Sequence, residues 1–296
     1  MRSLLFVPGD SERKQARCLE SKTDALILDL EDSVAPPQKP LAREMVAAFL
    51  RRTTSAPQRP LLYVRVNALD TGETDADLAA IMDGRPDGVL LPKTIGGASL
   101  KDLCARLTGH ERRVGTAEGS TRILPVATET AAAVLALPTV PGSTARLSGL
   151  TWGGEDLAAD IGAEANHDES GNYTPPYVMA RSMALLTAVA AACAPIETAF
   201  TNYTNAAAFR TDCLRSRRDG FTGRIAIHPS QVDTINEIFT PSAAVVAHSR
   251  RIVEAFRANP GLGVIGIDGE MIDMPHLRQA ERILRRHEAL EAIRRR

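Results

Sequence analysis

The sequence lacks a charge excess of either sign. Its 35 basic and 36 acidic side chains give a net charge of −1, so it offers no general electrostatic attraction for nucleic acid or for an anionic membrane. A local basic patch can still bind one phosphorylated ligand. We therefore expect small molecules as partners, with no nucleic acid and no membrane.

The sequence also lacks closely spaced cysteines and a long hydrophobic run. No two of its four cysteines have the C-x-x-C spacing of zinc or redox sites, and we interpret them as buried thiols in a reducing cytoplasm. The apolar helical stretch from Met179 to Cys193 is too short to span a bilayer. Arg2 is followed by only five residues before Pro8-Gly9, so no signal peptide is expected. These features predict a soluble, cytoplasmic protein.

What is present is a repeated alternation of short apolar runs and helical segments, typical of parallel βα units. The runs are 4–7, 25–30, 61–67, 88–93, 122–127, 146–151, 195–200 and 224–227. Because eight runs alternate with no sign of a break, a closed (β/α)8 barrel over residues 1–240 is favoured over an open sheet. Residues 241–296 exceed what a barrel needs and are predicted to form a C-terminal helical arm or lid.

Two shorter segments lead to further expectations. Residues 109–120 are polar and are expected to form a loop after a helix at 98–107. The connector from Gly261 to Gly266 reads G-x-G-x-x-G, but it follows a helix and Pro260, and no helix begins at its last glycine. The strand-to-helix context of a dinucleotide site is therefore missing.

The stretch LSGLTWGGEDLAADIG, residues 147–162, places Glu155 and Asp156 where a strand ends and a helix begins. Acids at this position are explained either by helix capping or by a site for a hard cation. A second pair, Glu31 and Asp32, follows the apolar run ALILDL. In barrels, catalytic side chains gather at the carboxyl ends of the strands. The polar side chains at these ends are Glu31, Asp32, Arg65, Asn67, Lys93, Glu129, Glu155, Asp156 and His228.

Eight ordered motifs carry a family resemblance that runs nearly end to end: RSLLFVPG, ALILDLEDSVAP, VRVN, GVLLPK, ILPVATET, TWGGEDLAADIG, AIHPSQV and MIDMP. Together they resemble the citrate lyase β-subunit-like branch of the HpcH/HpaI aldolase family, which includes malyl-CoA and citramalyl-CoA lyases. The resemblance implies a (β/α)8 barrel, Mg²⁺ as cofactor and a CoA-thioester substrate that yields a 2-oxo acid. It also implies a homotrimer or hexamer in which the arm reaches a neighbouring subunit.

The resemblance assigns roles to particular residues. Glu129 and Asp156 match the metal carboxylates, and Glu31 and Asp32 match acids that hold metal-bound waters. Two carboxylates plus a chelating 2-oxo acid suit Mg²⁺, which prefers oxygen ligands and keeps several waters. Arg65 matches the arginine that faces the reacting carbonyl. The residues matched to the CoA channel are Phe6, Arg17, Ile227 and His228.

Two further roles complete the implied carbon–carbon lyase. The backbone N–H groups from Gly154 through Glu155 to Asp156, at a helix start, would hold the substrate carboxylate. Asp273 matches an acid/base that a neighbouring subunit lends to the site. Asp273 could instead be only the N-cap of the last helix, and His228 could shape the strand exit instead of binding CoA.

Several alternatives stay open. Lys93 at a strand end would suit a Schiff-base aldolase. Thioester hydrolysis, a malate-synthase-like reaction, or action on an acyl-carrier-protein thioester would use the same scaffold, and a carrier-docking subunit with little activity is a further possibility. Glu197 stands where the family usually has Asp, Asn205 stands where an Asp often follows, and residues 166–172 form a polar insert near the barrel mouth.

Overall fold

The protein is described from a computed structural model that covers residues 1–294. The chain divides into two compact units, Met1–Asn236 and Glu237–Arg296, whereas the arm was expected to begin at residue 241. No helix among the described residues is both long and apolar enough to cross a membrane.

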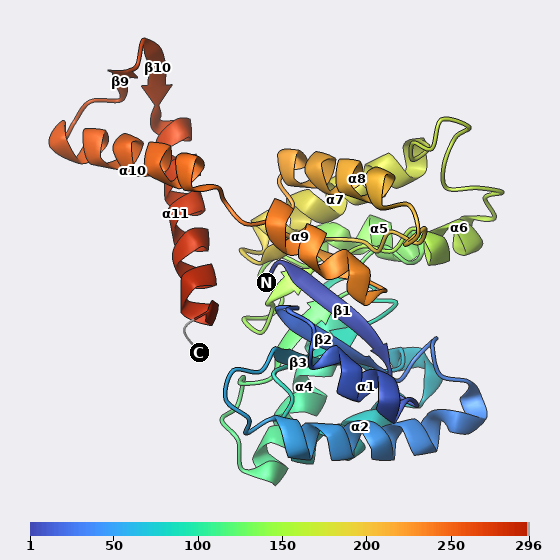
Figure 1. Cartoon of the computed structure of the whole chain (residues 1–296). Helices are drawn as coiled ribbons and strands as arrows, with labels where there is room; N and C mark the ends of the chain where they lie inside the picture. Colours follow the sequence, from blue (N-terminus) through green and yellow to red (C-terminus); the bar gives the residue numbers. More distant parts are fainter. Residues whose placement is uncertain (295–296) are drawn as a thin grey trace. The chain divides into compact units, whose positions relative to one another are not determined.

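The first unit is built on eight parallel strands (Figure 1). They are β1 (Ser3–Pro8), β2 (Ala25–Asp29), β3 (Leu61–Arg65), β4 (Gly88–Leu91), β5 (Arg122–Pro125), β6 (Gly149–Leu150), β7 (Ala194–Glu197) and β8 (Gly223–Ala226). The strand order is β5-β4-β3-β2-β1-β8-β7-β6, and parallel bridges from Ile123 to Leu147 and from Val126 to Thr151 join the two ends. The predicted (β/α)8 barrel is therefore confirmed.

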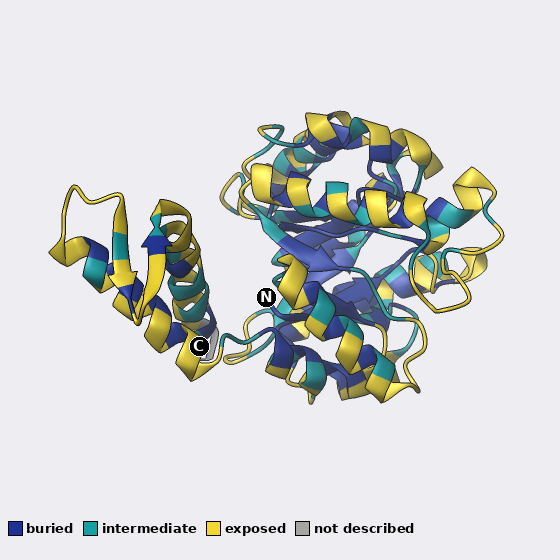
Figure 2. Cartoon of the chain, turned by 90° about the horizontal axis from the view of Figure 1, so that it is seen from above, coloured by how far each residue is buried: buried dark blue, intermediate teal, exposed yellow. Residues whose placement is uncertain are grey.

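Helices cover the outside of the barrel, with buried strands enclosed between them and exposed outer helix faces (Figure 2). They are α1 (Glu12–Cys18), α2 (Lys39–Thr53), α3 (Thr74–Ile81), α4 (Gly96–Val114), α5 (Ala131–Ala136), α6 (Glu155–Ile161), α7 (Pro175–Ala190), α8 (Ala206–Asp219) and α9 (Val232–Ile238). Helix α2 shows the reason for this arrangement, because Val46, Phe49, Leu50 and Thr53 recur on one buried stripe. Full burial of a leucine or phenylalanine side chain contributes about 2 kcal/mol.

The barrel interior is apolar at its centre and polar at its carboxyl end. All five residues of β2 are buried, as expected for a strand covered on both faces. Ile27, Tyr63 and Leu124 belong to one core cluster inside the barrel. The register pairs Asp29 of β2 with Arg65 of β3 at the strand ends, which brings the first charged pair to the barrel mouth.

The expected loop at 109–120 is wrong in its first half, because α4 continues through Gly109 and ends before Gly115, whose φ is +68°. A mid-helix glycine costs about 1 kcal/mol relative to alanine. The added turn carries Glu111, which is fully buried and bonded to Arg146. This long-range contact offsets the local cost and could not be read from the helix alone.

The second unit consists of α10 (Ala243–Ala258), a hairpin of β9 (Val264–Ile267) and β10 (Glu270–Asp273), and α11 (Met274–Arg294) (Figure 1). Its core includes Phe256, Ile267 and Ile272. The glycine-rich connector thus forms an antiparallel hairpin, which the sequence did not predict. Asp268 and Gly269 at its turn both have positive φ, as two-residue hairpin turns require.

Candidate active site

A cavity of about 360 Å³ opens at the carboxyl ends of the barrel strands. All the residues predicted to bind the metal and the substrate line it, together with two of the residues predicted for the CoA channel, Phe6 and Ile227. These are Phe6, Arg65, Glu129, Gly154, Glu155, Asp156 and Ile227. Glu129 follows β5, and Glu155 and Asp156 lie in the first turn of α6. The βα connections therefore bring residues far apart in sequence to one mouth.

The carboxyl group of Glu129, which lines this cavity, has a strongly raised pKa. Its side chain is buried, and its Oε2 accepts a hydrogen bond from the backbone N–H of Lys93. Burial and then the nearby negative charges of Asp156 and Glu31 raise the pKa of Glu129 to about 8, although the Lys93 N–H and Arg65 act in the opposite direction. A carboxyl group in these surroundings needs additional positive charge to ionise.

A divalent cation between Glu129 and Asp156 would supply that charge, and the oxygen donors suit Mg²⁺. Within residues 1–294, no three His, Cys, Asp or Glu side chains gather closely enough to hold a metal ion. A cation at this pair would therefore need water or substrate oxygens to complete its coordination. That is the usual behaviour of Mg²⁺ in enzyme sites.

Arg65 supplies the positively charged side chain in the lining of this cavity. Its Nε and Nη2 donate to the two carboxylate oxygens of Asp29 at 2.6 Å each, and its Nη1 lies 2.8 Å from Glu31 Oε2. The guanidinium lies 4.7 Å from the Phe6 ring centroid. Burial would lower the pKa of Arg65, but Asp29 and then Glu31 raise it. The guanidinium is thus fixed in place and charged.

The two predicted outer acids contact cations. Lys93 Nζ lies 2.9 Å from Glu31 Oε1 and 3.9 Å from Asp32 Oδ1. Burial acts to lower the pKa of Lys93, but the hydrogen bond and charge of Glu31 raise it. A Schiff-base lysine needs its amine unprotonated, so this environment disfavours the lysine mechanism. The positive φ of Lys93, +48°, aims its N–H at Glu129.

All four residues predicted for the CoA channel, Phe6, Arg17, Ile227 and His228, line a second cavity of about 560 Å³. It shares Phe6, Pro8 and Ile227 with the first, so the two cavities adjoin. Arg13 and Lys14 of α1 also line it, which gives the cavity three basic side chains with Arg17.

His228 has contacts that fit both of its predicted roles. Its ring stacks on Tyr203 with centroids 4.8 Å apart, and its Nδ1 accepts a hydrogen bond from the Ser230 backbone N–H at 3.2 Å. The second contact caps the short helical turn after β8. His228 therefore shapes the strand exit and also lines the second cavity, and its role toward CoA stays a prediction.

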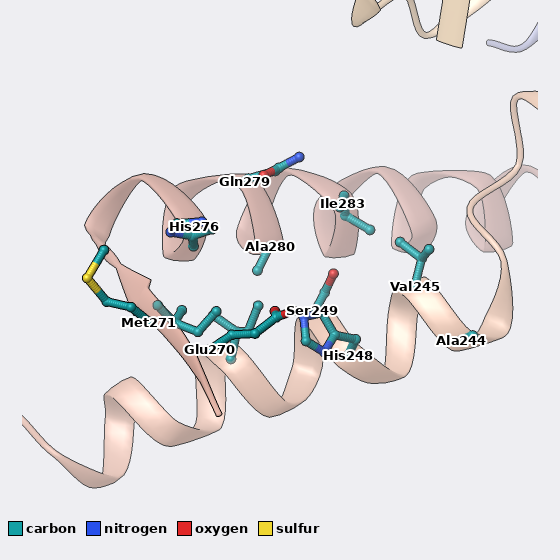
Figure 3. Close-up of a pocket in the computed structure, with 12 residues that line it drawn as sticks. Ala244, Val245, His248, Ser249, Glu270, Met271, His276, Gln279, Ala280 and Ile283 are labelled. Carbon is teal, nitrogen blue, oxygen red and sulfur yellow. The ribbon is translucent and has the colours of Figure 1, made fainter. Parts of the chain in front are cut away.

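Asp273 belongs to the second unit, where it ends β10 immediately before α11. Its Oδ1 lies 2.5 Å from His276 Nδ1, and its side chain remains about one-third exposed. His276 lines a cavity of about 600 Å³ together with His248 and Glu270, between α10, β10 and α11 (Figure 3). The position suits both a helix-terminal contact and an acid that faces outward, so its role stays a prediction.

Sequence reasoning missed several side chains of the site. Asp29 was not distinguished because every residue of its strand is buried, so no alternation marks the inward face. Arg13 and Lys14 were missed because charged residues on a short helix are usually solvated. The sequence signal that could have identified them is their position on the same short helix as Arg17, α1, which directly follows the end of the first strand.

A carboxylate pair, a fixed arginine and an adjoining basic cavity lie together at the barrel mouth, an arrangement typical of an enzyme active site. The sequence profile of the HpcH/HpaI aldolase/citrate lyase family matches residues 2–229. The chain belongs to this family, which confirms the resemblance seen in its motifs.

Curated relatives match this chain over nearly its full length. Citrate lyase subunit beta of Escherichia coli strain K12 is 33% identical, with 97% of this chain and 93% of that protein covered. L-malyl-CoA/beta-methylmalyl-CoA lyase of Cereibacter sphaeroides is 31% identical, with 98% and 96% covered. The (3S)-malyl-CoA thioesterase of Cereibacter sphaeroides is 30% identical, with 99% and 96% covered.

Among solved structures, the chain is similar to the protein CitE of Mycobacterium tuberculosis in complex with magnesium, acetoacetate and coenzyme A. The TM-score is 0.76 at 30% identity, with 97% of this chain and 98% of that chain covered. The chain is also similar to the citrate lyase beta subunit of M. tuberculosis complexed with oxaloacetate and magnesium. That structure is 28% identical with a TM-score of 0.67, with 81% of this chain and 96% of that chain covered. Both of these solved structures contain magnesium.

Proposed function

We propose that this protein is a Mg²⁺-dependent carbon–carbon lyase that cleaves, or in reverse forms, a 3-hydroxyacyl-CoA thioester. Malyl-CoA, citramalyl-CoA and citryl-CoA are the candidate substrates, and an acyl-CoA and a 2-oxo acid are the products. The observation that carries the proposal is the shared cavity of Glu129, Asp156 and Arg65, which adjoins a cavity lined by three basic side chains. The first suits the reacting carbons, and the second suits the CoA phosphates.

Glu129 and Asp156 would hold the Mg²⁺, which when bound supplies a Lewis acid and a template for the oxo-acid half. The Lys93 N–H and the loop at Gly153 fix the orientation of Glu129. The backbone N–H groups from Gly154 through Glu155 would orient the substrate carboxylate. Glu31 is placed to accept hydrogen bonds from water near this pair, while it also holds Lys93 and Arg65.

Cleavage breaks the bond between C2 and C3 of the acyl chain. The electron pair moves onto the thioester as an enolate, the C3 hydroxyl becomes the carbonyl of the oxo acid, and the hydroxyl proton passes to solvent water. Arg65 would stabilise the enolate oxygen, since its guanidinium is charged and held by Asp29. Asp273, lent by a neighbouring subunit, would exchange the proton with the enolate carbon. This role requires a homo-oligomer, which we propose to be a trimer or hexamer in the cytoplasm.

Thioester hydrolysis is the second candidate function. It is favoured by the similarity to (3S)-malyl-CoA thioesterase over 99% of this chain. The same enzyme would then release free CoA and a hydroxy acid instead of an acyl-CoA and an oxo acid. An acyl-carrier-protein thioester is a further possible substrate form.

The purified protein should be tested with malyl-CoA, citramalyl-CoA and citryl-CoA, with Mg²⁺ and with EDTA, while oxo acid, acyl-CoA and free CoA are followed separately. We expect oxo acid and acyl-CoA in equal amounts, lost in EDTA. Asp156→Asn and Glu129→Gln should lower kcat/KM by about 100-fold or more. Glu164→Gln, an exposed acid outside the cavity, is the matched control. Free CoA without oxo acid would support the hydrolase, and activity unaffected by EDTA would contradict the metal site.

A further inference from the structure

The wall of the active-site cavity includes Trp152, the only tryptophan of the chain. Although it lines the cavity, only 1% of it is accessible. The loop after it is packed tightly: a Cβ added at Gly154 would lie 3.3 Å from the Trp152 ring, and one added at Gly153 would lie 2.8 Å from Cγ of Glu129. The loop thus runs between the indole and a predicted metal carboxylate with no spare room.

The indole is held from behind by a buried acid. Trp152 Nε1 donates a hydrogen bond to Glu197 Oε1 at 2.5 Å. The other oxygen of Glu197 accepts from Arg181 Nε at 2.9 Å, and Glu197 itself is 2% exposed. Glu197 does not line the cavity, yet it fixes the plane and depth of the ring that does.

Tyr173, the residue that follows the polar insert 166–172, packs against the same wall. Tyr173 presents its ring to Trp152 in an edge contact, with centroids 5.1 Å apart and planes at 69°. The His167 ring also packs on Tyr173, with centroids 4.2 Å apart, and a backbone bridge joins the two residues. Asn166 Nδ2 donates to Glu155 Oε1 at 2.9 Å. Tyr173 and Asn166 therefore contact the two ends of the loop that carries Gly153 and Gly154.

We propose that Tyr173 and Glu197 are positioning residues that fix Trp152, and that this clamped wall limits the size of the group attached to the carbonyl carbon of the 2-oxo acid. This inference rests on the proposed lyase function. A wall with packing on both sides cannot retreat for a larger group without displacing the loop between Trp152 and Asp156. We therefore expect the enzyme to favour pyruvate or glyoxylate over oxo acids with longer aliphatic chains.

The test uses the full-length protein in the condensation direction, with acetyl-CoA and either pyruvate or 2-oxobutyrate. One added methylene in a close-fitting pocket changes discrimination by roughly 10-fold or more. In Tyr173→Ala, the ratio of kcat/KM for 2-oxobutyrate to that for pyruvate should rise about 10-fold. Glu197→Gln should raise the ratio less, because the amide oxygen can still accept from the indole. Tyr173→Phe keeps the ring and should match the wild type, as should the control Glu164→Gln.

Because Trp152 is the only tryptophan, its fluorescence reports the wall without requiring turnover. Its emission should shift to longer wavelength, and acrylamide should quench it more strongly, in Tyr173→Ala but not in Tyr173→Phe. Circular dichroism and the unfolding midpoint establish that each variant is folded. If Tyr173→Ala misfolds, Tyr173→Leu replaces it.

The outcomes separate the two proposals. A wild type that neither condenses nor cleaves any thioester overturns the lyase function. In that case the clamp is still tested by the affinity for pyruvate in the presence of Mg²⁺, measured by quenching of Trp152 fluorescence. This affinity is compared between the wild type and Tyr173→Ala. An active wild type whose Tyr173→Ala variant keeps the same substrate ratio overturns the clamp, whether or not the emission changes.

Discussion

At the scale of single residues, the site depends on how closely Glu129 is surrounded. The carboxyl group is buried, receives the Lys93 N–H and faces other acids. Its pKa of about 8 lies far above the value of about 4.3 for a free glutamate. In the metal-free protein the group is therefore mainly protonated at neutral pH, and Mg²⁺ must displace that proton.

This predicts pH-dependent metal binding. The Mg²⁺ affinity should fall by about tenfold for each pH unit below about 8, with nearly one proton released per ion at pH 7. Calorimetry in buffers of different ionisation enthalpy measures both quantities. An affinity independent of pH between 6 and 8 would contradict the assignment of Glu129.

The free energy of unfolding of the metal-free protein depends on pH in the opposite direction to the Mg²⁺ affinity. Because the folded-state pKa of Glu129 is raised, the folded metal-free protein binds more protons than the unfolded chain between about pH 4 and pH 8. The contribution of this group to the free energy of unfolding therefore declines as the pH rises through that window. Glu129→Gln, which cannot ionise, should remove this part of the pH dependence in urea unfolding.

The close packing around Gly153 predicts that adding one carbon atom there, in Gly153→Ala, disturbs the site. A Cβ at this position would lie 2.8 Å from Cγ of Glu129, so Gly153→Ala should push the carboxylate or the loop aside. We expect kcat/KM to fall by about 10- to 100-fold and the Mg²⁺ concentration for half-maximal activity to rise. Gly109→Ala is the control, because nothing lies within 4 Å of its Cβ. It should leave activity unchanged and stabilise α4 by up to about 1 kcal/mol.

At the scale of elements, the apolar runs predicted the strands because strands buried on both faces need continuous hydrophobic sequence. The acids at the strand ends were predicted for the same reason: the end of an apolar run marks the barrel mouth. The extension of α4 to Val114 was not predictable, since it depends on Glu111 meeting Arg146 from 35 residues away. The hairpin after α10 was missed because two four-residue strands give little periodic signal.

The Glu111–Arg146 pair predicts a large stability effect outside the active site. Glu111 accepts from Arg146 Nη1 and Nη2 at 2.7 Å each, and from the Thr121 N–H at 2.8 Å. Removing one partner of such a buried pair costs about 3 kcal/mol or more, so Arg146→Met should lower the free energy of unfolding by that amount. The exposed pair Arg112–Glu118 supplies the control, and Arg112→Met should have a much smaller effect.

The pH dependence of this pair follows from the pKa of Glu111. Burial alone would raise it, but the hydrogen bonds from Arg146, Thr121 and Gly119 lower it to about 2. The stabilisation is therefore present above about pH 4 and is lost as the pH falls toward 2. The difference between wild type and Arg146→Met should shrink over that range in urea unfolding. If the difference in the free energy of unfolding did not change with pH, Arg146 would stabilise the protein by packing alone.

At the scale of the whole molecule, the arrangement of subunits is the part that a single chain predicts least. The barrel and its acids follow from local patterns, whereas Asp273 belongs to a second unit with its own core. Its proposed role requires a site assembled from two subunits, which no periodicity in one sequence encodes. Only the family resemblance suggested it.

Mixing two inactive variants tests that assembly. Asp273→Asn keeps an intact barrel site, and Asp156→Asn keeps an intact arm, so each should be nearly inactive alone. If each arm serves a neighbouring barrel, random reassembly of the two in equal amounts should restore about one quarter of the wild-type activity, since half of the barrels and half of the arms are intact. If Asp273 acts on its own barrel, every site carries one defect and no activity returns. Mixing Asp156→Asn with Glu129→Gln is the control, because both defects lie in the barrel and no pairing of subunits can repair it.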